Sequence, residues 1–134
     1  MSEPRGLRLN NPGNIRRTSD KWKGLADVQE DKKFFTFKEM KWGYRALMKL
    51  LLNYHTKYGC TTVPDYIKRY APYSENNTFA YIKTVCNRLK VGEDTPIDLT
   101  DRDRLCDFAA AISFVENGRE GNYKDIYQGY ELLD

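Results

Sequence analysis

The sequence has few of the side chains on which metal and nucleophilic sites are usually built. It contains one histidine and three cysteines, and none of them lies at metal-ligand spacing from the others, so we expect neither a metal nor a cofactor. It has no Gly-x-Ser-x-Gly motif, no Cys/His pairing and no phosphate-binding loop, which excludes the common nucleophilic hydrolases and nucleotide-binding enzymes. We interpret His55 as a packing residue, and Cys60, Cys86 and Cys106 as buried, reduced thiols.

Long apolar runs are missing as well. No stretch approaches the roughly 20 apolar residues that a membrane-spanning helix needs. The first six residues, Met-Ser-Glu-Pro-Arg-Gly, lack the apolar segment of a signal peptide. Repeats and low-complexity segments are also absent. We therefore expect one domain over residues 1–134, a monomer without a membrane span, made in the cytoplasm without a signal peptide.

Aromatic residues and an uneven charge distribution are the prominent features that the sequence does contain. Ten tyrosines, six phenylalanines and two tryptophans in 134 residues favour a groove for a sugar-like ligand, although aromatic residues also build cores. Residues 1–60 carry 13 Lys and Arg against 6 Asp and Glu, whereas residues 61–134 carry 9 against 13. A basic first half is suited to an anionic polymer, either nucleic acid or bacterial wall, but scattered charges are also typical of an ordinary solvated surface.

The spacing of apolar residues predicts a mainly α (α+β) protein. In residues 1–38, the Asn-Pro and Pro-Gly steps predict a tight turn, and alternating or aromatic residues at 7–9, 22–25 and 34–37 predict short strands. Residues 39–134 carry helical periodicity and helix-capping residues instead. They predict helices over 39–58, 62–70, 78–90 and 100–118, the last capped by Thr100 and ended by Gly118, with a short turn of helix in 123–133.

The helix over 100–118 carries the strongest candidate for a catalytic residue. Its apolar stripe contains Glu116, together with Leu105, Phe108, Ala109, Ile112 and Val115. Partial burial and the negative end of the helix dipole both raise the pKa of a carboxylate, which is how a general acid stays protonated near neutral pH. The alternative is that Glu116, in the last helical turn, points into solvent.

Glu75 is the second candidate carboxylate. It lies just before the helix that begins at residue 78, where the positive end of the helix dipole would keep it ionised. The alternative is that it merely caps that helix. Carboxylates, amides and aromatic rings are the groups used in glycoside cleavage, which needs one protonated acid and either a second carboxylate or help from the substrate.

Several motifs resemble a family of small phage and prophage proteins that are described as virion structural proteins and as lysozyme-like. The resemblance covers nearly the whole chain. It rests on Arg-Gly-Leu-Arg-Leu-Asn-Asn-Pro-Gly-Asn-Ile-Arg at 5–16, Trp22-x-Gly24, Phe35-x-Phe37, Trp-Gly-Tyr-Arg-Ala at 42–46, Tyr-Ala-Pro-x-x-Glu-Asn-Asn-Thr-x-x-Tyr at 70–81 and Val-Glu-Asn-Gly at 115–118.

A looser resemblance links the chain to soluble lytic transglycosylases and goose-type lysozymes. Their Gly-Leu-x-Gln strand, core helix and Glu-Thr-x-x-Tyr-Val helix resemble residues 6–9, 43–58 and 77–85. Their helix that ends in the catalytic Glu comes first in those families, whereas here the similar helix comes last and ends at Glu116. The resemblance therefore implies a lysozyme-like fold in circularly permuted order.

The same resemblance implies roles for individual residues. Glu116 becomes the catalytic acid and then base, and Tyr81 lines the sugar subsites. Arg8 and Leu9 stand where those families have Met-Gln, so a substrate hydrogen bond from that glutamine must come from the amides at 10, 11 or 14 or be lost. The candidate substrate-binding set is Asn11, Asn14, Tyr81, Asn76 and Tyr70.

Three functions remain open from the sequence. The first is cleavage of peptidoglycan glycan strands by a phage- or mobile-element-derived muramidase or lytic transglycosylase, acting on the wall or periplasm after phage-type release or from within a virion. The second is a non-catalytic virion structural or wall-binding module with the same fold. The third, nucleic-acid binding through the basic half, is the least favoured, because the charges are scattered.

Overall fold

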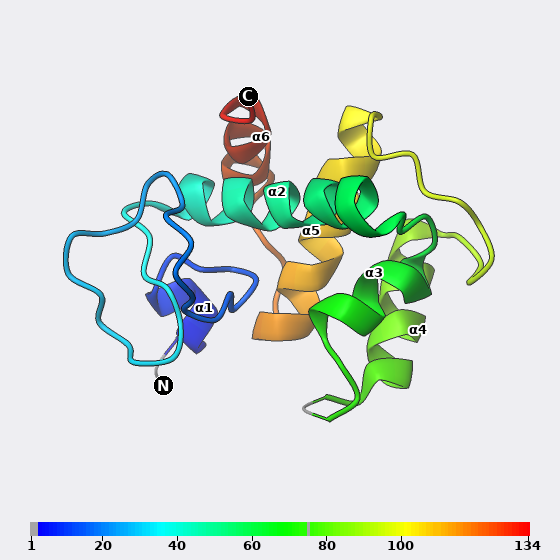
Figure 1. Cartoon of the computed structure of the whole chain (residues 1–134), viewed down its shortest axis with the longest axis horizontal. Helices are drawn as coiled ribbons and strands as arrows, with labels where there is room; N and C mark the ends of the chain where they lie inside the picture. Colours follow the sequence, from blue (N-terminus) through cyan, green and yellow to red (C-terminus); the bar gives the residue numbers. More distant parts are fainter. Residues whose placement is uncertain (1–2, 75) are drawn as a thin grey trace.

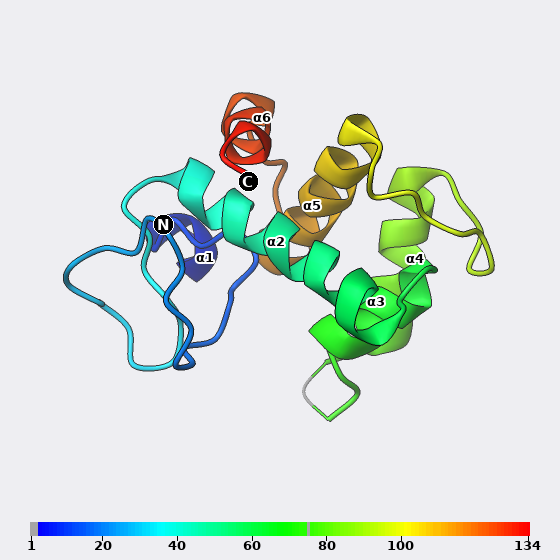
Figure 2. The same ribbon diagram turned by 45° about the horizontal axis from the view of Figure 1, so that its top comes forward.

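The computed structural model describes residues 3–74 and 76–134, and its regular elements in those ranges are six helices (Figure 1). In chain order they are α1 (Arg5–Arg8), α2 (Met40–Tyr58), α3 (Val63–Tyr70), α4 (Thr78–Leu89), α5 (Arg102–Asn117) and α6 (Tyr123–Glu131). Both ribbon views place α1 and its loops at one end of α2, and α3 and α4 at the other (Figure 2). The mainly helical character that the sequence predicts is confirmed.

The predicted N-terminal β region is wrong. Within the described residues there is no strand, only two isolated bridges, Arg16–Phe34 and Leu25–Phe37, and the predicted strand at 7–9 overlaps α1. Phe34, Phe35 and Phe37 are all buried, so the segment lacks the alternation of a half-buried strand. Its backbone also bonds to side chains, since Asn11 donates to the Phe35 carbonyl at 2.9 Å.

Helix ends follow the capping chemistry of the sequence closely. Thr62 and Asp65 form a capping box at the start of α3, and Gly59 and Gly118 end α2 and α5 at φ 67° and 71°. The predicted cap of α5 is wrong by one residue, because Asp101 caps it. Thr100 instead bonds back to Asp98 through both its amide and its hydroxyl.

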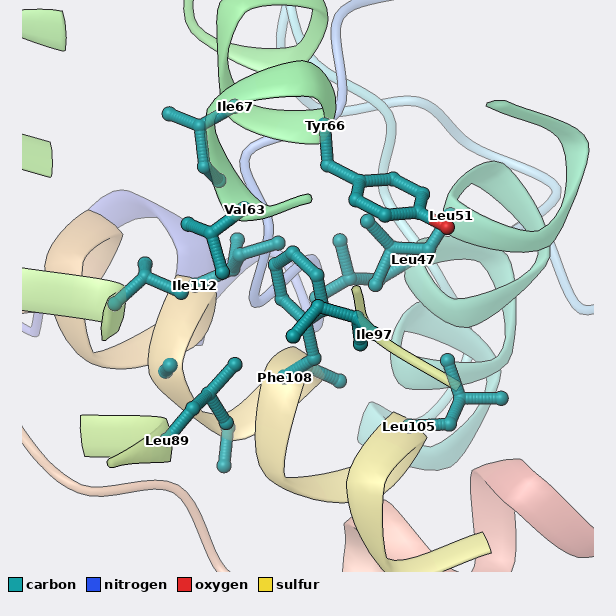
Figure 3. Close-up of a cluster of buried hydrophobic side chains, with 14 of the residues drawn as sticks. Leu47, Leu51, Val63, Tyr66, Ile67, Leu89, Ile97, Leu105, Phe108 and Ile112 are labelled. Atoms are coloured by element: carbon teal, nitrogen blue, oxygen red, sulfur yellow. The ribbon is translucent and has the colours of Figure 1, made fainter. Parts of the chain in front are cut away.

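The main core lies where α2, α3, α4, α5 and α6 meet (Figure 3). Tyr66 of α3 packs edge-on against Phe108 of α5, with ring centroids 5.3 Å apart. A second, smaller cluster joins Ile15, Phe35 and Phe37 to Ala46 on α2. Helix α2 therefore has one face in the main core and another under the N-terminal loops, which fixes the two parts of the molecule against each other.

The predicted state of the cysteines is confirmed, whereas that of His55 is wrong. Cys60, Cys86 and Cys106 are free and buried, and burial raises the pKa of the Cys106 thiol to about 11. His55 is exposed, and its ring Nδ1 lies 2.8 Å from the Cys60 carbonyl, so it joins the end of α2 to the next segment. No helix in the described ranges is both long and apolar enough to cross a membrane.

Two side chains of the Trp-Gly-Tyr-Arg-Ala motif hold α2 to its neighbours. The Tyr44 hydroxyl lies 2.9 Å from the Ser113 hydroxyl of α5, and both residues are buried. Arg45, also buried, donates to the Leu132 carbonyl at 3.1 Å and to Asp134 at 2.7 Å. These bonds satisfy polar groups that would otherwise be costly to bury, and they orient α5 and the segment after α6 on α2.

The glycine of that motif, Gly43, allows the N-terminal turn to touch α2 directly. A Cβ atom at this position would lie 2.2 Å from the Asn10 carbonyl oxygen and 2.6 Å from Pro12 Cδ. Asn10 itself has a left-handed backbone, with φ 54°. The turn over residues 9–14 is therefore seated on the backbone of α2, and its position depends on the absence of a side chain at 43.

We predict that Gly43→Ala destabilises the protein by about 2–4 kcal/mol, measured as the free energy of unfolding in urea. Alanine would gain about 1 kcal/mol of helix propensity, but the clash with a backbone carbonyl outweighs this gain because the turn cannot rotate away. Gly92→Ala is the control, since its Cβ would meet only the Thr95 hydroxyl at 3.5 Å. Equal stability of the two variants would contradict the contact.

Candidate functional site

Glu116 lies in the last turn of α5 and is held by two hydrogen bonds. Asn14 Nδ2 donates to its Oε1 at 2.9 Å, and the Tyr81 hydroxyl donates to its Oε2 at 2.8 Å. Asn14 comes from the turn after α1, and Tyr81 is a buried residue of α4. The side chain is partly buried, so the alternative in which it points into solvent is not the arrangement of this structure.

The surroundings of Glu116 favour its protonated form. Burial raises the pKa of the Glu116 carboxyl above its usual value, and this effect exceeds the opposing effects of its neighbours. The hydrogen bonds from Asn14 and Tyr81 lower the pKa, as do the positive charges of Arg5 and Arg16. Near neutral pH this carboxyl therefore holds its proton more often than an exposed glutamate does.

Two hollows meet at Glu116. The larger, of about 500 Å³, lies between the N-terminal loops and the α3 end of the molecule. The smaller, of about 300 Å³, runs along α4 past Ala80, Tyr81 and Thr84. Glu116 and Asn76 line both of them, so a ligand that occupied the two hollows together would pass the carboxyl group.

The turn that carries Asn14 is fixed by residues on both sides of it. Asn117, next to Glu116, donates from Nδ2 to the Pro12 carbonyl at 2.8 Å and to the Ser113 carbonyl at 3.0 Å. Asn14 has a left-handed backbone at φ 50°, which costs free energy and persists only where the surroundings impose it. The Tyr70 hydroxyl donates to the Gly13 carbonyl from the other side.

Gly6 has no side chain and so leaves room for the side chains of Asn14 and Asn117. A Cβ atom there would lie 2.4 Å from Asn117 Oδ1 and 3.0 Å from Asn14 Oδ1. Both amide oxygens are buried and have no hydrogen-bond partner among the described residues. Sequence reasoning did not assign Asn117 or Gly6 a role, although both belong to motifs that carried the resemblance.

Most of the predicted site residues converge on Glu116. Asn14 and Tyr81 bond to it directly, and Tyr70 and Asn76 line the larger hollow. The remaining two candidates, Asn11 and Glu75, do not join this set.

Asn11 is fully buried, and its amide bonds to the backbone of Ile15 and Phe35, so we assign it to the structure of the turn. Glu75 lies outside the described residues. No group of three or more His, Cys, Asp or Glu in the ranges 3–74 and 76–134 is placed to hold a metal ion.

The sequence comparisons point to a phage protein. The chain is 35% identical over 130 residues to protein P5 of Pseudoalteromonas phage PM2, an alignment that covers 95% of this chain and 80% of P5. The chain belongs to the family of this phage protein. The predicted resemblance to a phage protein is therefore confirmed, with P5 as the relative. No protein-family model matches the chain, so no lysozyme family supports the finer part of that resemblance.

The hydrogen bond from Tyr81 gives a testable pKa shift in this P5-type protein. The Tyr81→Phe variant removes a donor that stabilises the ionised carboxylate, so the pKa of Glu116 should rise further. The measurement is the titration of the Glu116 side-chain carbon by NMR. Tyr123→Phe, which removes a hydroxyl that bonds to Asp107 instead, should leave that midpoint unchanged. A midpoint that falls in Tyr81→Phe would contradict the assigned bond.

Burial of Glu116 also predicts a pH-dependent stability difference. The pKa of Glu116 is raised in the folded protein, so the stability that Glu116 contributes is fully present below the usual pKa of a glutamate, 4.5. This contribution is lost as the pH rises through the folded-state pKa of Glu116. Glu116→Gln mimics the protonated carboxyl at all pH values. We therefore expect similar melting temperatures for the two proteins near pH 4, and a higher one for the variant near pH 8. A variant that is less stable than wild type at pH 8 would refute this.

Proposed function

We propose that this P5-type protein cleaves the glycan strands of peptidoglycan, with Glu116 as the single general acid and base. The observation that carries the proposal is a partly buried carboxyl group with a raised pKa at the junction of two hollows. A protonated carboxyl at this point is suited to donate to the oxygen that links two sugars, one in each hollow. Asn14, Tyr81, Tyr70 and Asn76 are the proposed substrate-side residues.

The proposed chemistry follows from the two hydrogen bonds to Glu116. When the carboxyl gives its proton to the glycosidic oxygen, the bond from that oxygen to the anomeric carbon breaks and positive charge develops on the sugar ring. The carboxylate left behind accepts from Asn14 and Tyr81, which stabilise its negative charge. It then takes a proton from the group whose oxygen bonds to the anomeric carbon: a water molecule, which gives hydrolysis, or a hydroxyl of the same sugar, which gives transglycosylation.

We further propose that the site is lysozyme-like in circularly permuted order. The Asn-rich turn, α4 and the end of α5 come from the start, middle and end of the chain and meet at one carboxyl group. In this arrangement α5 would hold the place of the helix that carries the catalytic glutamate. The phage relative is consistent with delivery to the wall by phage-type release or by a virion.

A second candidate function is a non-catalytic phage structural or wall-binding module. The observation in its favour is the relative itself, which is a phage protein whose name states no activity. In that case the two hollows would bind the glycan strand without cleaving it, and Glu116 would serve only as a hydrogen-bond acceptor. The two candidates differ in one measurable property, the release of soluble fragments.

We predict that wild type releases soluble muropeptides from Gram-negative sacculi and that Glu116→Gln lowers this rate by at least about 100-fold, since general acid catalysis contributes roughly that much. The readout is clearing of turbidity, with chromatography of the products to separate hydrolysis from transglycosylation. Activity of wild type should also fall as pH rises through the raised pKa of Glu116, because only the protonated form donates.

Glu120→Gln is the matched control, since Glu120 is exposed and pairs with Arg88 away from both hollows. It should clear sacculi at the wild-type rate. Equal clearing by Glu116→Gln and wild type would remove Glu116 from its role. Binding to sacculi without any release by wild type would favour the non-catalytic module.

A further inference from the structure

We infer that Asn117 is a positioning residue, which holds Asn14 against Glu116 by binding the turn over residues 9–14 to the helix end that carries this glutamate. The inference deepens the proposed function and rests on it only for the effect on catalysis. Asn117 follows Glu116 in the last turn of α5 and is buried, with 7% of its surface exposed. It lines neither of the two hollows, so any effect it has on a ligand passes through its neighbours.

The side-chain amide of Asn117 connects α5 to the turn. Its Nδ2 donates to the Ser113 carbonyl, within the same helix, at 3.0 Å, and to the Pro12 carbonyl, in the turn, at 2.8 Å. The first bond orients the amide group on the helix, and the second attaches the turn to it. Because Asn117 is the next residue after Glu116, a movement of this end of α5 would carry the turn and the glutamate together.

Side chains hold both of the carbonyl groups that precede Asn14 in the chain. Asn117 binds the carbonyl of Pro12, and the Tyr70 hydroxyl donates to the carbonyl of Gly13. The two peptide groups before Asn14 are therefore fixed from opposite sides, one by α5 and the other by α3.

This fixed backbone determines where the side chain of Asn14 lies. The Asn14 N–H donates to the Asn11 carbonyl at 3.0 Å, and φ of Asn14 is 50°, a left-handed value that is uncommon for residues other than glycine. From this backbone, Asn14 Nδ2 reaches Glu116 Oε1 at 2.9 Å. If the turn lost its bond to Asn117, the backbone of Asn14 would be less restrained and this contact would weaken.

Asn117 acts on the turn through its NH₂ group alone. Its Oδ1 is buried and has no hydrogen-bond partner among the described residues, and it lies where a Cβ atom on Gly6 would clash with it. A side chain of similar size that lacks an N–H should therefore fill the same space and lose the positioning effect.

The test is a double-variant cycle that follows the pKa of Glu116 by NMR of its side-chain carbon. Asn117→Leu removes the donor to the turn, and Asn14→Gly removes the group that contacts Glu116 while tolerating the positive φ. Each should raise the pKa, because the ionised carboxylate loses stabilisation by Asn14 while the contact of the turn with Gly43 keeps it covered. In the double variant the pKa should rise no further than in Asn14→Gly alone.

Asn117→Ser separates the two bonds of the amide group, and it also serves if the leucine variant does not fold. A serine hydroxyl in a helix can donate to the carbonyl four residues earlier, here that of Ser113, but it is too short to reach Pro12 as well. The pKa of Glu116 should therefore rise in this variant too. Both Asn117 variants should release muropeptides from sacculi at least about tenfold more slowly than wild type.

Tyr44→Phe is the matched control, because it removes a different buried hydrogen bond to α5, the one to the Ser113 hydroxyl. It should lower the melting temperature and leave the pKa of Glu116 unchanged. A purely structural role of Asn117 would give this same pattern, so Asn117 variants that lose stability without a rise in the pKa would overturn the inference. Additive shifts in the double variant would also overturn it.

Failure of this inference is separable from failure of the proposed function, since the pKa of Glu116 is measured without substrate. Coupled pKa shifts in a protein whose wild type releases no fragments would support the positioning role and reject catalysis. Fragment release that depends on Glu116 but is unchanged in both Asn117 variants would reject the positioning role and leave the proposed function standing.

Discussion

The contact of the turn over residues 9–14 with the backbone of α2 at Gly43 and with the Asn117 side chain of α5 is the constraint on which the candidate site depends. A glutamate in the last turn of a helix normally points into water. Here the turn covers it, because Gly43 lets the chain approach α2 and Asn117 bonds the turn to the end of α5. The turn then supplies Asn14 as a donor to Glu116. The burial that raises the pKa of Glu116 is thus a property of tertiary packing.

Two local features of the candidate site cost free energy in the folded protein. The raised pKa of Glu116 means that the ionised form is destabilised in the folded protein, and the left-handed backbone of Asn14 costs further free energy. Neither is needed to form the main core, which is built from apolar contacts among α2, α3, α4, α5 and α6. Part of the stability of the protein therefore offsets the burial of Glu116 and the strained backbone of Asn14.

Local patterns predicted the helices well and the N-terminal region badly. Helical periodicity with Gly59 and Gly118 fixed where α2 and α5 end, and the apolar stripe correctly placed Glu116 towards the interior. The aromatic segment at 34–37 resembled a strand locally, but its backbone bonds are divided among the Asn11 side chain and the backbones of Leu9 and Ile15, which are distant in sequence. The larger hollow could not be predicted for a similar reason, since its lining comes from separate segments that meet only after folding.

Two arginines and Glu116 are also coupled electrically. Arg5 and Arg16 lower the pKa of Glu116, so they oppose the effect of burial. The pKa of Glu116 is therefore set by the balance between burial, which raises it, and these two positive charges together with the hydrogen bonds from Asn14 and Tyr81, which lower it.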